Sequence, residues 1–472
     1  MRERLQAWLK AHPGFERELR RRAKRALIVG GAAFLILVVT GAMSFGLIWL
    51  TAVALALYVP PWGALRHGSW VVVFGVLLLA LLYPFYHANL FQVPIFGQFP
   101  SVDTGVTMLI FIMMALGLNI VVGYAGLLDL GYVAFYAMGA YTAAWFASQH
   151  FSGKNLHLGS VGINPDSPGI HISIWIVIFI AAIFTAMVGV IIGFPTLRLR
   201  GDYLAIVTLG FGEIMPQIAR NGDHLFGQNL TNGPQGINPI DPPGFGNGLH
   251  NAVGLPSDYL TFHTTFLGTK ISGVELFFWT ALALVLFTVF CSVRLRDSRL
   301  GRAWIAIRED ETAAAAMGVP LMRTKTWAYA AGAFFGGIAG AYYASFKSGT
   351  FPDDFFFNIS IFILCMVILG GMGNIWGVIL GGGFLAYLNQ EGLGNIGGWL
   401  NQHFSGESNS PDKWFTVWHS DIDVPLYQFG IFGVILVLVM LFKPEGLIPS
   451  SRQKAEFHEG VSDEPLYDAQ HE

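Results

Sequence analysis

Residues 172–194 read ISIWIVIFIAAIFTAMVGVIIGF, a run of 23 without a charged side chain. A helix that spans the hydrocarbon core of a bilayer needs about 20 predominantly apolar residues. The run therefore predicts a membrane-spanning helix.

Similar apolar runs recur along the chain, at 26–43, 45–59, 70–86, 106–122, 131–147, 203–219, 274–293, 327–345, 359–370, 376–388 and 428–442. The runs 45–59, 359–370 and 376–388 are short, so each could be re-entrant or could merge with a neighbour. Of the 472 residues, 54% are hydrophobic and 12% charged, against about a quarter charged in soluble domains. We predict an all-α, polytopic bundle of about 10–12 transmembrane helices.

Basic residues alternate between the loops. Predicted inside loops carry Arg66, then Arg198 and Arg200, then seven basic residues in 294–326, whereas predicted outside loops carry one lysine each: Lys154, Lys270, Lys347 and Lys413. Cytoplasmic loops are enriched in Lys and Arg. The alternation predicts an even number of crossings, with both termini in the cytoplasm. Residues 1–25 are too long and basic for a signal peptide, so we expect an uncleaved first span.

Several functions are excluded by what the sequence lacks. It has no G-x-x-x-x-G-K-[ST] loop for ATP and no H-E-x-x-H zinc motif. Cys291 and Cys365 both fall within apolar runs, and a net charge of -3 gives no basic excess for nucleic acid. We expect a non-enzymatic chain without cofactor or metal.

Residues 301–320 read GRAWIAIREDETAAAAMGVP. Acidic residues at 309–311 suit a helix N-terminus, alanine favours helix, and Gly318 followed by Pro320 predicts its end. A short helix with small residues on one face could sit in the groove of a partner protein, or it could be an ordinary connection.

This segment resembles the coupling loop of bacterial ABC importers, in which a Glu-Ala-Ala…Gly pattern corresponds here to Glu311, Ala313, Ala314 and Gly318, with Thr312 intervening. The chain more broadly resembles the M-type integral membrane subunit of the LIV branched-chain amino-acid transporters. The resemblance covers about 105–449 and rests on GLNIVVG (117–123), GLLDLGY (126–132), LRLRGDYLAIVTLGFGE (197–213), GPQGI (233–237), GRAW (301–304), REDE (308–311), VILGGMG (367–373) and PEGL (444–447).

The resemblance implies a permease in the bacterial cytoplasmic membrane that alternates access to a substrate path. Implied partners are a second, related permease, two cytoplasmic ATPase subunits and an extracytoplasmic substrate-binding protein. It also implies that the ATPases act on a coupling loop formed by Arg308, Glu309, Asp310, Glu311, Ala313, Ala314 and Gly318. Leucine, isoleucine and valine are the implied substrates; another amino acid, an amide or urea is the alternative.

We divide the chain into a basic arm (1–25), accessory spans (26–100), a permease core (101–449) and a cytoplasmic tail (450–472). The core would include an external loop at 221–273 and a cytoplasmic coupling loop at 294–326.

Polar groups inside apolar runs are candidates for the translocation path because they are costly in lipid. Asn119 and Glu213 lie inside such runs, and Asp129 lies at the predicted cytoplasmic edge of one; these three residues are the candidates. The alternative for Glu213 is a carboxyl that packs between helices. Ionisable groups are sparse, which disfavours an ion-coupled secondary transporter, and no His or Asp cluster indicates a membrane enzyme. The pair Gly336 and Gly340 predicts close helix contacts, either static or sliding.

Overall fold

A computed structural model describes residues 77, 79–85, 87, 99–159, 161, 166–199, 202–224, 227–245, 256, 258–260, 262–266, 269–405, 420–443 and 446–448. The predicted arm 1–25, the spans 26–43 and 45–59 and the tail 450–472 lie outside these residues, and the span 70–86 lies within them only in part. The chain divides into two compact units, residues 1–103 with 394–422 and residues 104–393 with 423–472.

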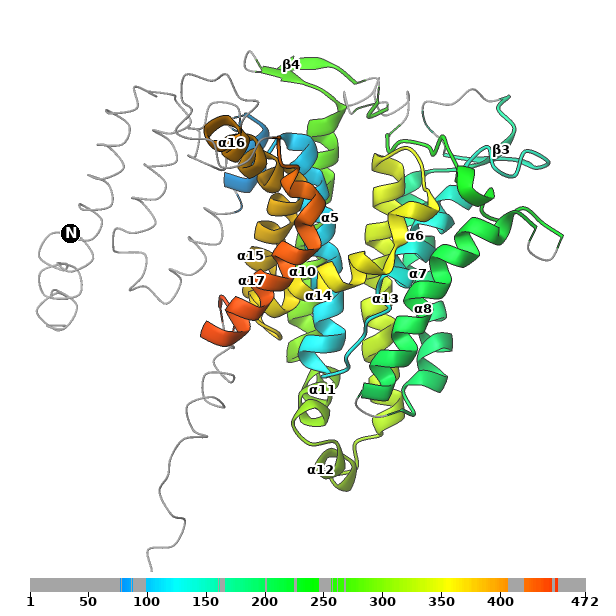
Figure 1. Cartoon of the computed structure of the whole chain (residues 1–472). Coiled ribbons are helices and arrows are strands. Elements are labelled where there is room, and N and C mark those ends of the chain that lie inside the picture. The colour runs from blue at the N-terminus through cyan, green and yellow to red at the C-terminus, as the bar shows by residue number, and fades with distance from the viewer. Residues whose placement is uncertain are drawn as a thin grey trace, which may run out of the picture. The chain divides into compact units, whose positions relative to one another are not determined.

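Helices build the larger unit (Figure 1). They are α5 (Val102–Leu118) with its π-helical extension η2 (Asn119–Tyr124), α6 (Val133–Phe146), α7 (Ile174–Thr196), α8 (Asp202–Asn221), α10 (Gly273–Asp297), α11 (Arg299–Glu309), α12 (Glu311–Ala316), α13 (Leu321–Phe346), α14 (Phe357–Gly370), α15 (Ile375–Tyr387), η6 (Leu388–Gly392) and α17 (Gln428–Phe442). Short 3-10 turns connect them: η3 (Gly222–His224), η4 (Gly233–Gln235), η5 (Pro352–Phe355) and η7 (Val424–Tyr427).

All nine apolar runs predicted between 106 and 442 form helices within a few residues of the predicted bounds. Four helices of the described chain are long and apolar enough to span a bilayer: Val102–Tyr124, Ile174–Thr196, Gly273–Asp297 and Val424–Phe442. The prediction of an all-α polytopic membrane bundle is confirmed. The number of crossings stays a prediction.

The two short runs 359–370 and 376–388 form separate helices, α14 and α15. The break falls at Gly371, whose φ of 111° lies in a region that residues with a Cβ rarely adopt. Asn374 then caps α15 by accepting a hydrogen bond from the backbone N–H of Trp376 at 3.1 Å. The chain therefore reverses between the helices, and α14 packs against α15.

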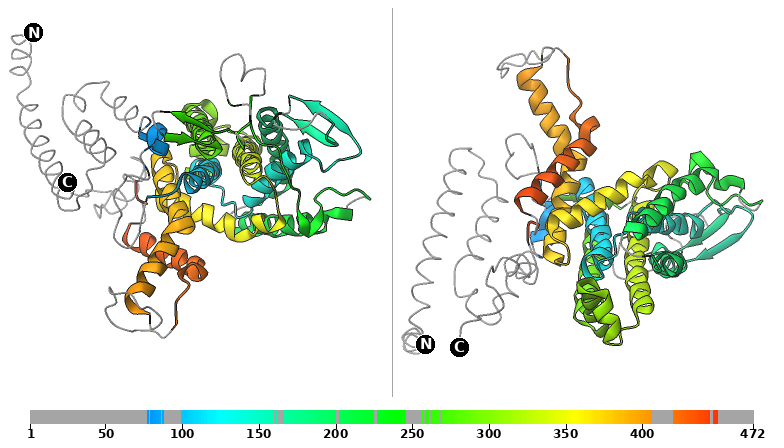
Figure 2. Two further views of the ribbon diagram at one scale, coloured as in Figure 1. Left: turned by 90° about the horizontal axis from the view of Figure 1, so that it is seen from above. Right: turned by 60° about the horizontal axis from the view of Figure 1, so that its bottom comes forward.

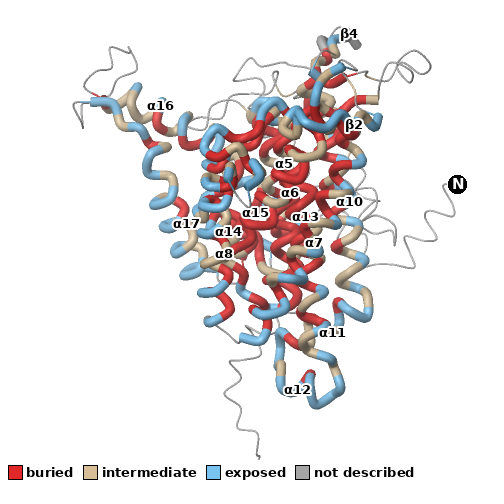
Figure 3. Tube along the Cα trace, turned by 90° about the vertical axis from the view of Figure 1, so that its right-hand side faces the viewer, coloured by how far each residue is buried: buried red, intermediate tan, exposed pale blue. Residues whose placement is uncertain are grey.

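The core of the larger unit is the contact of α13 with α6 and α7, which lie side by side in Figures 1 and 2. Small residues allow this approach. A Cβ added to Gly340 would lie 2.0 Å from the carbonyl oxygen of Tyr136, and one added to Gly139 would lie 2.3 Å from that of Gly337. Figure 3 shows buried residues along α6 and α13, whereas α17 is largely exposed. The close contact predicted at Gly340 is confirmed.

Short strands occur in the segments predicted as external loops. β1 (Ala147–Ser148), β3 (Gly169–Ile172) and β2 (Asn155–Leu158) form a sheet in the order β1-β3-β2. β1 pairs antiparallel to β3, and β2 pairs parallel to it. β4 (Thr264–Phe266) and β5 (Thr269–Ile271) form an antiparallel hairpin. These segments are thus folded structure attached to the helix bundle.

The smaller unit contains most of α16 (Leu393–Phe404). Asn401 exchanges two hydrogen bonds with the backbone of Ile422, at 2.9 and 3.0 Å. The predicted outside loop that carries Lys413 spans 389–427, and for the first part of this range the prediction of a loop is wrong. Leu393, Ile396 and Leu400 recur at helical spacing there, and such periodicity favours an amphipathic helix.

Candidate functional site: a coupling segment and a polar cavity

The segment α11–α12 lies at one end of the larger unit, and the β3 sheet lies at the opposite end (Figure 1). The arginines counted as an inside loop lie in the last turn of α10 (Arg294 and Arg296), in α11 (Arg299, Arg302 and Arg308) and in the first turn of α13 (Arg323). Within the larger unit, this Arg-rich segment and the sheet that follows α6 therefore lie at opposite ends (Figure 1).

The start and end predicted for α12 are confirmed in detail. Asp310 is its N-cap, and its Oδ1 accepts hydrogen bonds from the hydroxyl of Thr312 at 2.6 Å and from the N–H groups of Thr312 and Ala313. These bonds lower the pKa of Asp310, the Thr312 hydroxyl bond most of all. At the other end Gly318 has a φ of 83°, and the N–H groups of Gly318 and Val319 bond to Ala315 and Ala314. This is a Schellman motif.

Two contacts fix the segment to α13. The indole N–H of Trp304, which is fully buried, donates to the carbonyl oxygen of Thr324 at 2.8 Å. The Nζ of Lys325 lies 2.8 Å from Oε1 of Glu311, and the lysine side chain is only 5% exposed. Because a buried cation is costly without a partner, this ion pair holds α12 in place. Movement of α12 would consequently be transmitted to α13.

The residues predicted for coupling divide into two groups. Glu309, Asp310, Ala313 and Gly318 are exposed at the tip, as is Met317, which is 85% exposed. Ala314 is buried, and Glu311 is engaged with Lys325. The exposed group combines carboxylates, small residues and one apolar side chain, which together suit a protein contact.

Arg308 reaches from α11 into the helix bundle. Its guanidinium donates a hydrogen bond of 2.7 Å to the carbonyl oxygen of Gly123 in η2. Next to this carbonyl, the side-chain oxygen of Asn119 accepts a bond of 2.8 Å from the N–H of Gly373. A Cβ on Gly373 would lie within 3.4 Å of both Gly123 and Arg308. Arg308, η2 and the turn between α14 and α15 therefore meet at one point, which we call the Arg308 junction.

The three residues predicted for the path do not come together at one site. Asn119 is fully buried in the Arg308 junction. Asp129 is buried before α6, where its Oδ1 accepts from the N–H of Gly131 at 2.9 Å. Glu213 is exposed on α8, as is Gln217 one turn later. The path role of all three stays a prediction.

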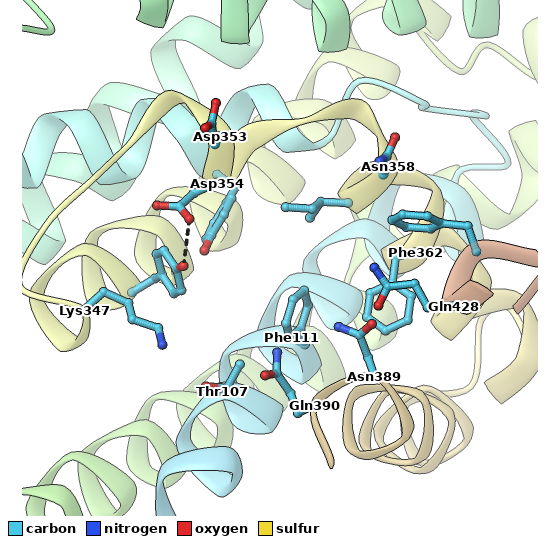
Figure 4. A pocket seen from close by; sticks show the side chains of 14 residues that line it. Thr107, Phe111, Lys347, Asp353, Asp354, Asn358, Phe362, Asn389, Gln390 and Gln428 are labelled. Carbon is cyan, nitrogen blue, oxygen red and sulfur yellow. Dashed lines mark hydrogen bonds between the residues drawn. The ribbon is translucent and has the colours of Figure 1, made fainter. Parts of the chain in front are cut away.

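A cavity of about 270 Å³ opens on the larger unit, at the end of α13 (Figure 4). Its walls come from α5, α6, α13, η5, α14, η6 and α17. Its lining residues are Thr107, Phe111, Tyr136, Tyr343, Lys347, Asp353, Asp354, Asn358, Ile359, Phe362, Asn389, Gln390, Gln428 and Phe429. None of the predicted site residues is among them.

Sequence reasoning missed these residues for identifiable reasons. Lys347 served only as a loop charge, and Asp353 and Asp354 fall between apolar runs. The available signal was the spacing of Lys347 from two adjacent carboxylates in one short connection. Lys325 was likewise counted as a loop charge, although its side chain is buried.

A buried polar cluster joins the β3 sheet to the connection before α10. Nδ1 of His171 lies 2.9 Å from Oδ2 of Asp241, and the ring of His157 stacks on His171 at 5.0 Å between centroids. The carbonyl oxygen of Asp241 accepts from the hydroxyl of Ser345 at 2.9 Å, which ties the cluster to α13. Burial raises the pKa of Asp241 to about 6, against the opposing effect of His171.

We expect this cluster to contribute more to the free energy of unfolding at acidic pH. Because the folded-state pKa lies above the usual 3.8, the folded chain binds a proton between about pH 4 and 6 that the unfolded chain does not. The uptake of this proton contributes up to about 3 kcal/mol to the free energy of unfolding. The contribution is complete below pH 4 and is lost as pH rises through 6. In Asp241→Asn, the gain in melting temperature over wild type should be largest at pH 7.5 and vanish near pH 4.5, measured by tryptophan fluorescence in detergent. A difference independent of pH would contradict this.

A protein family described as "Branched-chain amino acid transport system / permease component" matches residues 102–440. The chain is 33% identical over 391 residues to the high-affinity branched-chain amino acid transport system permease protein LivM of Escherichia coli K12, covering 82% of this chain and 77% of that protein. It is 34% identical over 363 residues to LivM of Salmonella typhimurium, covering 76% and 72%.

A shorter match, 26% identical over 189 residues, links it to the permease protein LivH of Escherichia coli K12 and covers 38% of this chain and 57% of that protein. No solved structure matches the chain significantly. The chain belongs to the family of permease components of branched-chain amino acid transport systems.

Proposed function

We propose that this chain is the M-type permease subunit of an ATP-driven importer of leucine, isoleucine and valine. It hydrolyses no ATP itself, since two partner ATPases do so, and an extracytoplasmic binding protein delivers the substrate. The names of the LivM relatives support the substrate class. The match to LivH supports pairing with a second, related permease.

The observation that carries the mechanism is the α11–α12 segment. Its tip is exposed, its base is fixed to α13 by Trp304 and by the Lys325–Glu311 ion pair, and Arg308 extends from it to η2. An ATPase that binds the exposed tip of this segment and moves when it binds ATP would therefore displace α13 and η2 together. Since α13 is the centre of helix packing, this displacement would reorient the bundle and alternate access to the path.

The orientation that follows places α11–α12 in the cytoplasm and the β3 sheet outside. With an even number of crossings, both termini are cytoplasmic, in a bacterial cytoplasmic membrane. The density of arginine in 294–326 supports this orientation. We retain residues 101–449 as the permease core, 26–100 as accessory spans, and 1–25 and 450–472 as cytoplasmic extensions.

Glu213 is the strongest of the predicted path residues. It and Gln217 are exposed on one face of α8, and exposed polar groups on a membrane helix require water or a partner. The proposed second permease would supply that environment, so that this face of α8 borders the path between the two permeases. Asn119 and Asp129, both buried, would act on the path through helix position.

The test is uptake of labelled leucine into proteoliposomes that contain this chain, its second permease, the ATPases and the binding protein. We expect uptake that needs both internal ATP and the binding protein. Uptake by this chain alone under a proton or sodium gradient would contradict the proposal and establish a secondary transporter. ATP hydrolysis without leucine uptake would contradict the substrate only, and other amino acids, amides and urea would be tested next.

A further inference from the structure

The cavity at the end of α13 carries opposite charges on neighbouring elements. Lys347 is the C-cap of α13, and Asp354 lies in η5, seven residues later. In Figure 4 the carboxylate of Asp354 points to the hydroxyl of Tyr343, and the Lys347 amine points into the space that Phe111, Thr107 and Gln390 border. The positive charge of Lys347 and the negative charge of Asp354 therefore border the same small cavity.

These two groups retain bonding capacity. Among the residues that the structure describes, Lys347 forms no ion pair within 4 Å. Asp354 accepts only long hydrogen bonds, 3.3 Å from the hydroxyl of Tyr343 and 3.3 Å from the N–H of Phe351. Burial raises the pKa of Asp354, although Lys347 opposes this. A ligand cation would offset the cost of burying this carboxylate.

The second carboxylate of the cavity is already neutralised. Asp353 accepts a 2.7 Å hydrogen bond from Arg220 at the end of α8. The remaining charged groups are thus one lysine and one aspartate, with a net charge of zero.

The rest of the cavity is lined by apolar side chains and by the side-chain amides of Asn and Gln residues. Phe111 and Phe362 meet edge to face, with their ring centroids 5.5 Å apart, and Ile359 lies one turn before Phe362 on α14. The amides of Asn358, Asn389 and Gln428 complete the wall on the far side from Lys347, and the amide of Gln390 lies beside Phe111 and Thr107 (Figure 4). The volume of about 270 Å³ is just below the range of about 300–1,000 Å³ that is typical of ligand sites.

We propose that this cavity is a transient site for the amino-acid zwitterion on the permease itself. Lys347 receives the α-carboxylate, Asp354 and the hydroxyl of Tyr343 receive the α-ammonium, and Phe111, Ile359 and Phe362 contact the aliphatic side chain. A zwitterion carries both charges and no net charge, as the cavity does. A neutral amide or urea carries neither charge, so it would form no ion pair with Lys347 or Asp354 and would bind less tightly.

This site deepens the proposed function and rests on it. It assigns part of the amino-acid selectivity to the permease, in addition to the binding protein. The aromatic wall accommodates leucine, isoleucine and valine alike, because apolar contact is not directional.

The test compares Lys347→Met and Asp354→Asn with wild type in the assembled transporter, reconstituted with its binding protein. Three quantities are measured: ATP-dependent leucine uptake, ATP hydrolysis stimulated by leucine-loaded binding protein, and the melting temperature of the complex. We expect uptake to fall about tenfold or more in each variant, with the other two quantities unchanged. Lys154→Met and Asp166→Asn, exposed substitutions of the same types in the segment before α7, should keep wild-type uptake.

A direct measurement uses Asn358→Cys at the cavity mouth, after Cys291 and Cys365 are replaced by alanine. Leucine should slow the reaction of this cysteine with a maleimide, and Lys347→Met should abolish the protection. Wild-type uptake in both variants would overturn the site and leave the proposed function standing. Lost uptake with a lowered melting temperature would show a structural role and also overturn it. Failure of leucine uptake in the wild-type transporter, with ATP hydrolysis intact, would overturn the proposed substrate and this site with it.

Discussion

Gly340→Ala is expected to destabilise the helix bundle by about 3 kcal/mol or more, at the upper end of the cost of overpacking. The added Cβ would lie 2.0 Å from the carbonyl oxygen of Tyr136. Both groups are fixed to helix backbones, so that only separation of α6 from α13 relieves the clash. We expect a large fall in the melting temperature of the detergent-solubilised protein. Gly340→Leu should yield no monodisperse protein in size-exclusion chromatography.

Gly210→Ala is the matched control. Gly210 lies inside α8, and an added Cβ would meet nothing within 4 Å. Alanine is favoured over glycine in helices by about 0.5–1 kcal/mol, so that this variant should be as stable as wild type or slightly more so. Similar melting temperatures for Gly340→Ala and Gly210→Ala would mean that α6 and α13 do not approach so closely.

Arg308→Ala is expected to reduce ATP-dependent leucine uptake roughly ten- to hundredfold, since a hydrogen bond from a charged group contributes about 1.5–3 kcal/mol. The substitution removes the bond between Arg308 and the carbonyl oxygen of Gly123, the direct link from α11 to η2. Docking of the ATPase should survive, because the exposed tip of α12 is untouched. ATP hydrolysis should therefore continue within about threefold of wild type while transport stops, as measured on the same proteoliposomes.

Crosslinking distinguishes a loss of ATPase docking from a loss of the transmission of movement to the helix bundle. A cysteine introduced at the exposed position Ala313 should crosslink to an ATPase subunit. The yield should be the same whether position 308 is the wild-type Arg308 or carries the Arg308→Ala substitution. Arg302→Ala is the matched control, since Arg302 is an exposed arginine of the same helix and its side chain bonds only to the backbone of Asp297 among the described residues. Loss of the crosslink in Arg308→Ala would assign this residue to docking instead, and unchanged uptake would contradict its role in coupling.

Much of the architecture could be predicted because its signals are local. Each apolar run between 106 and 442 is a helix, since hydrophobicity over a window of about 20 residues is enough to identify one. The bounds of α12 were predicted from the acidic residues 309–311, from Gly318 and from Pro320, because helix ends depend on neighbouring residues. The helix α16 was missed because glycine and polar residues interrupt its apolar face.

The roles of single residues were harder to predict. Glu311 and Lys325 are 14 positions apart, and nothing local pairs them. The contact becomes evident only when α12 folds back beside α13. Asn119 was selected for the path as a polar group in an apolar run, and that role stays a prediction. Its bond to Gly373 spans 254 positions. Its position in the Arg308 junction therefore depends on the packing of α5 against the turn between α14 and α15.

The sequence by itself determined that this protein is a helical membrane protein, where most of its apolar helices lie, and which loop is rich in arginine. These properties follow from composition and hydrogen bonding over a few turns of chain. Only the tertiary structure decided that Arg308 meets η2 and that Lys347 and Asp354 share a cavity with Phe111 and Phe362. Such sites depend on how helices far apart in the chain are rotated and spaced, and that arrangement results from the packing of small residues along α6, α7 and α13.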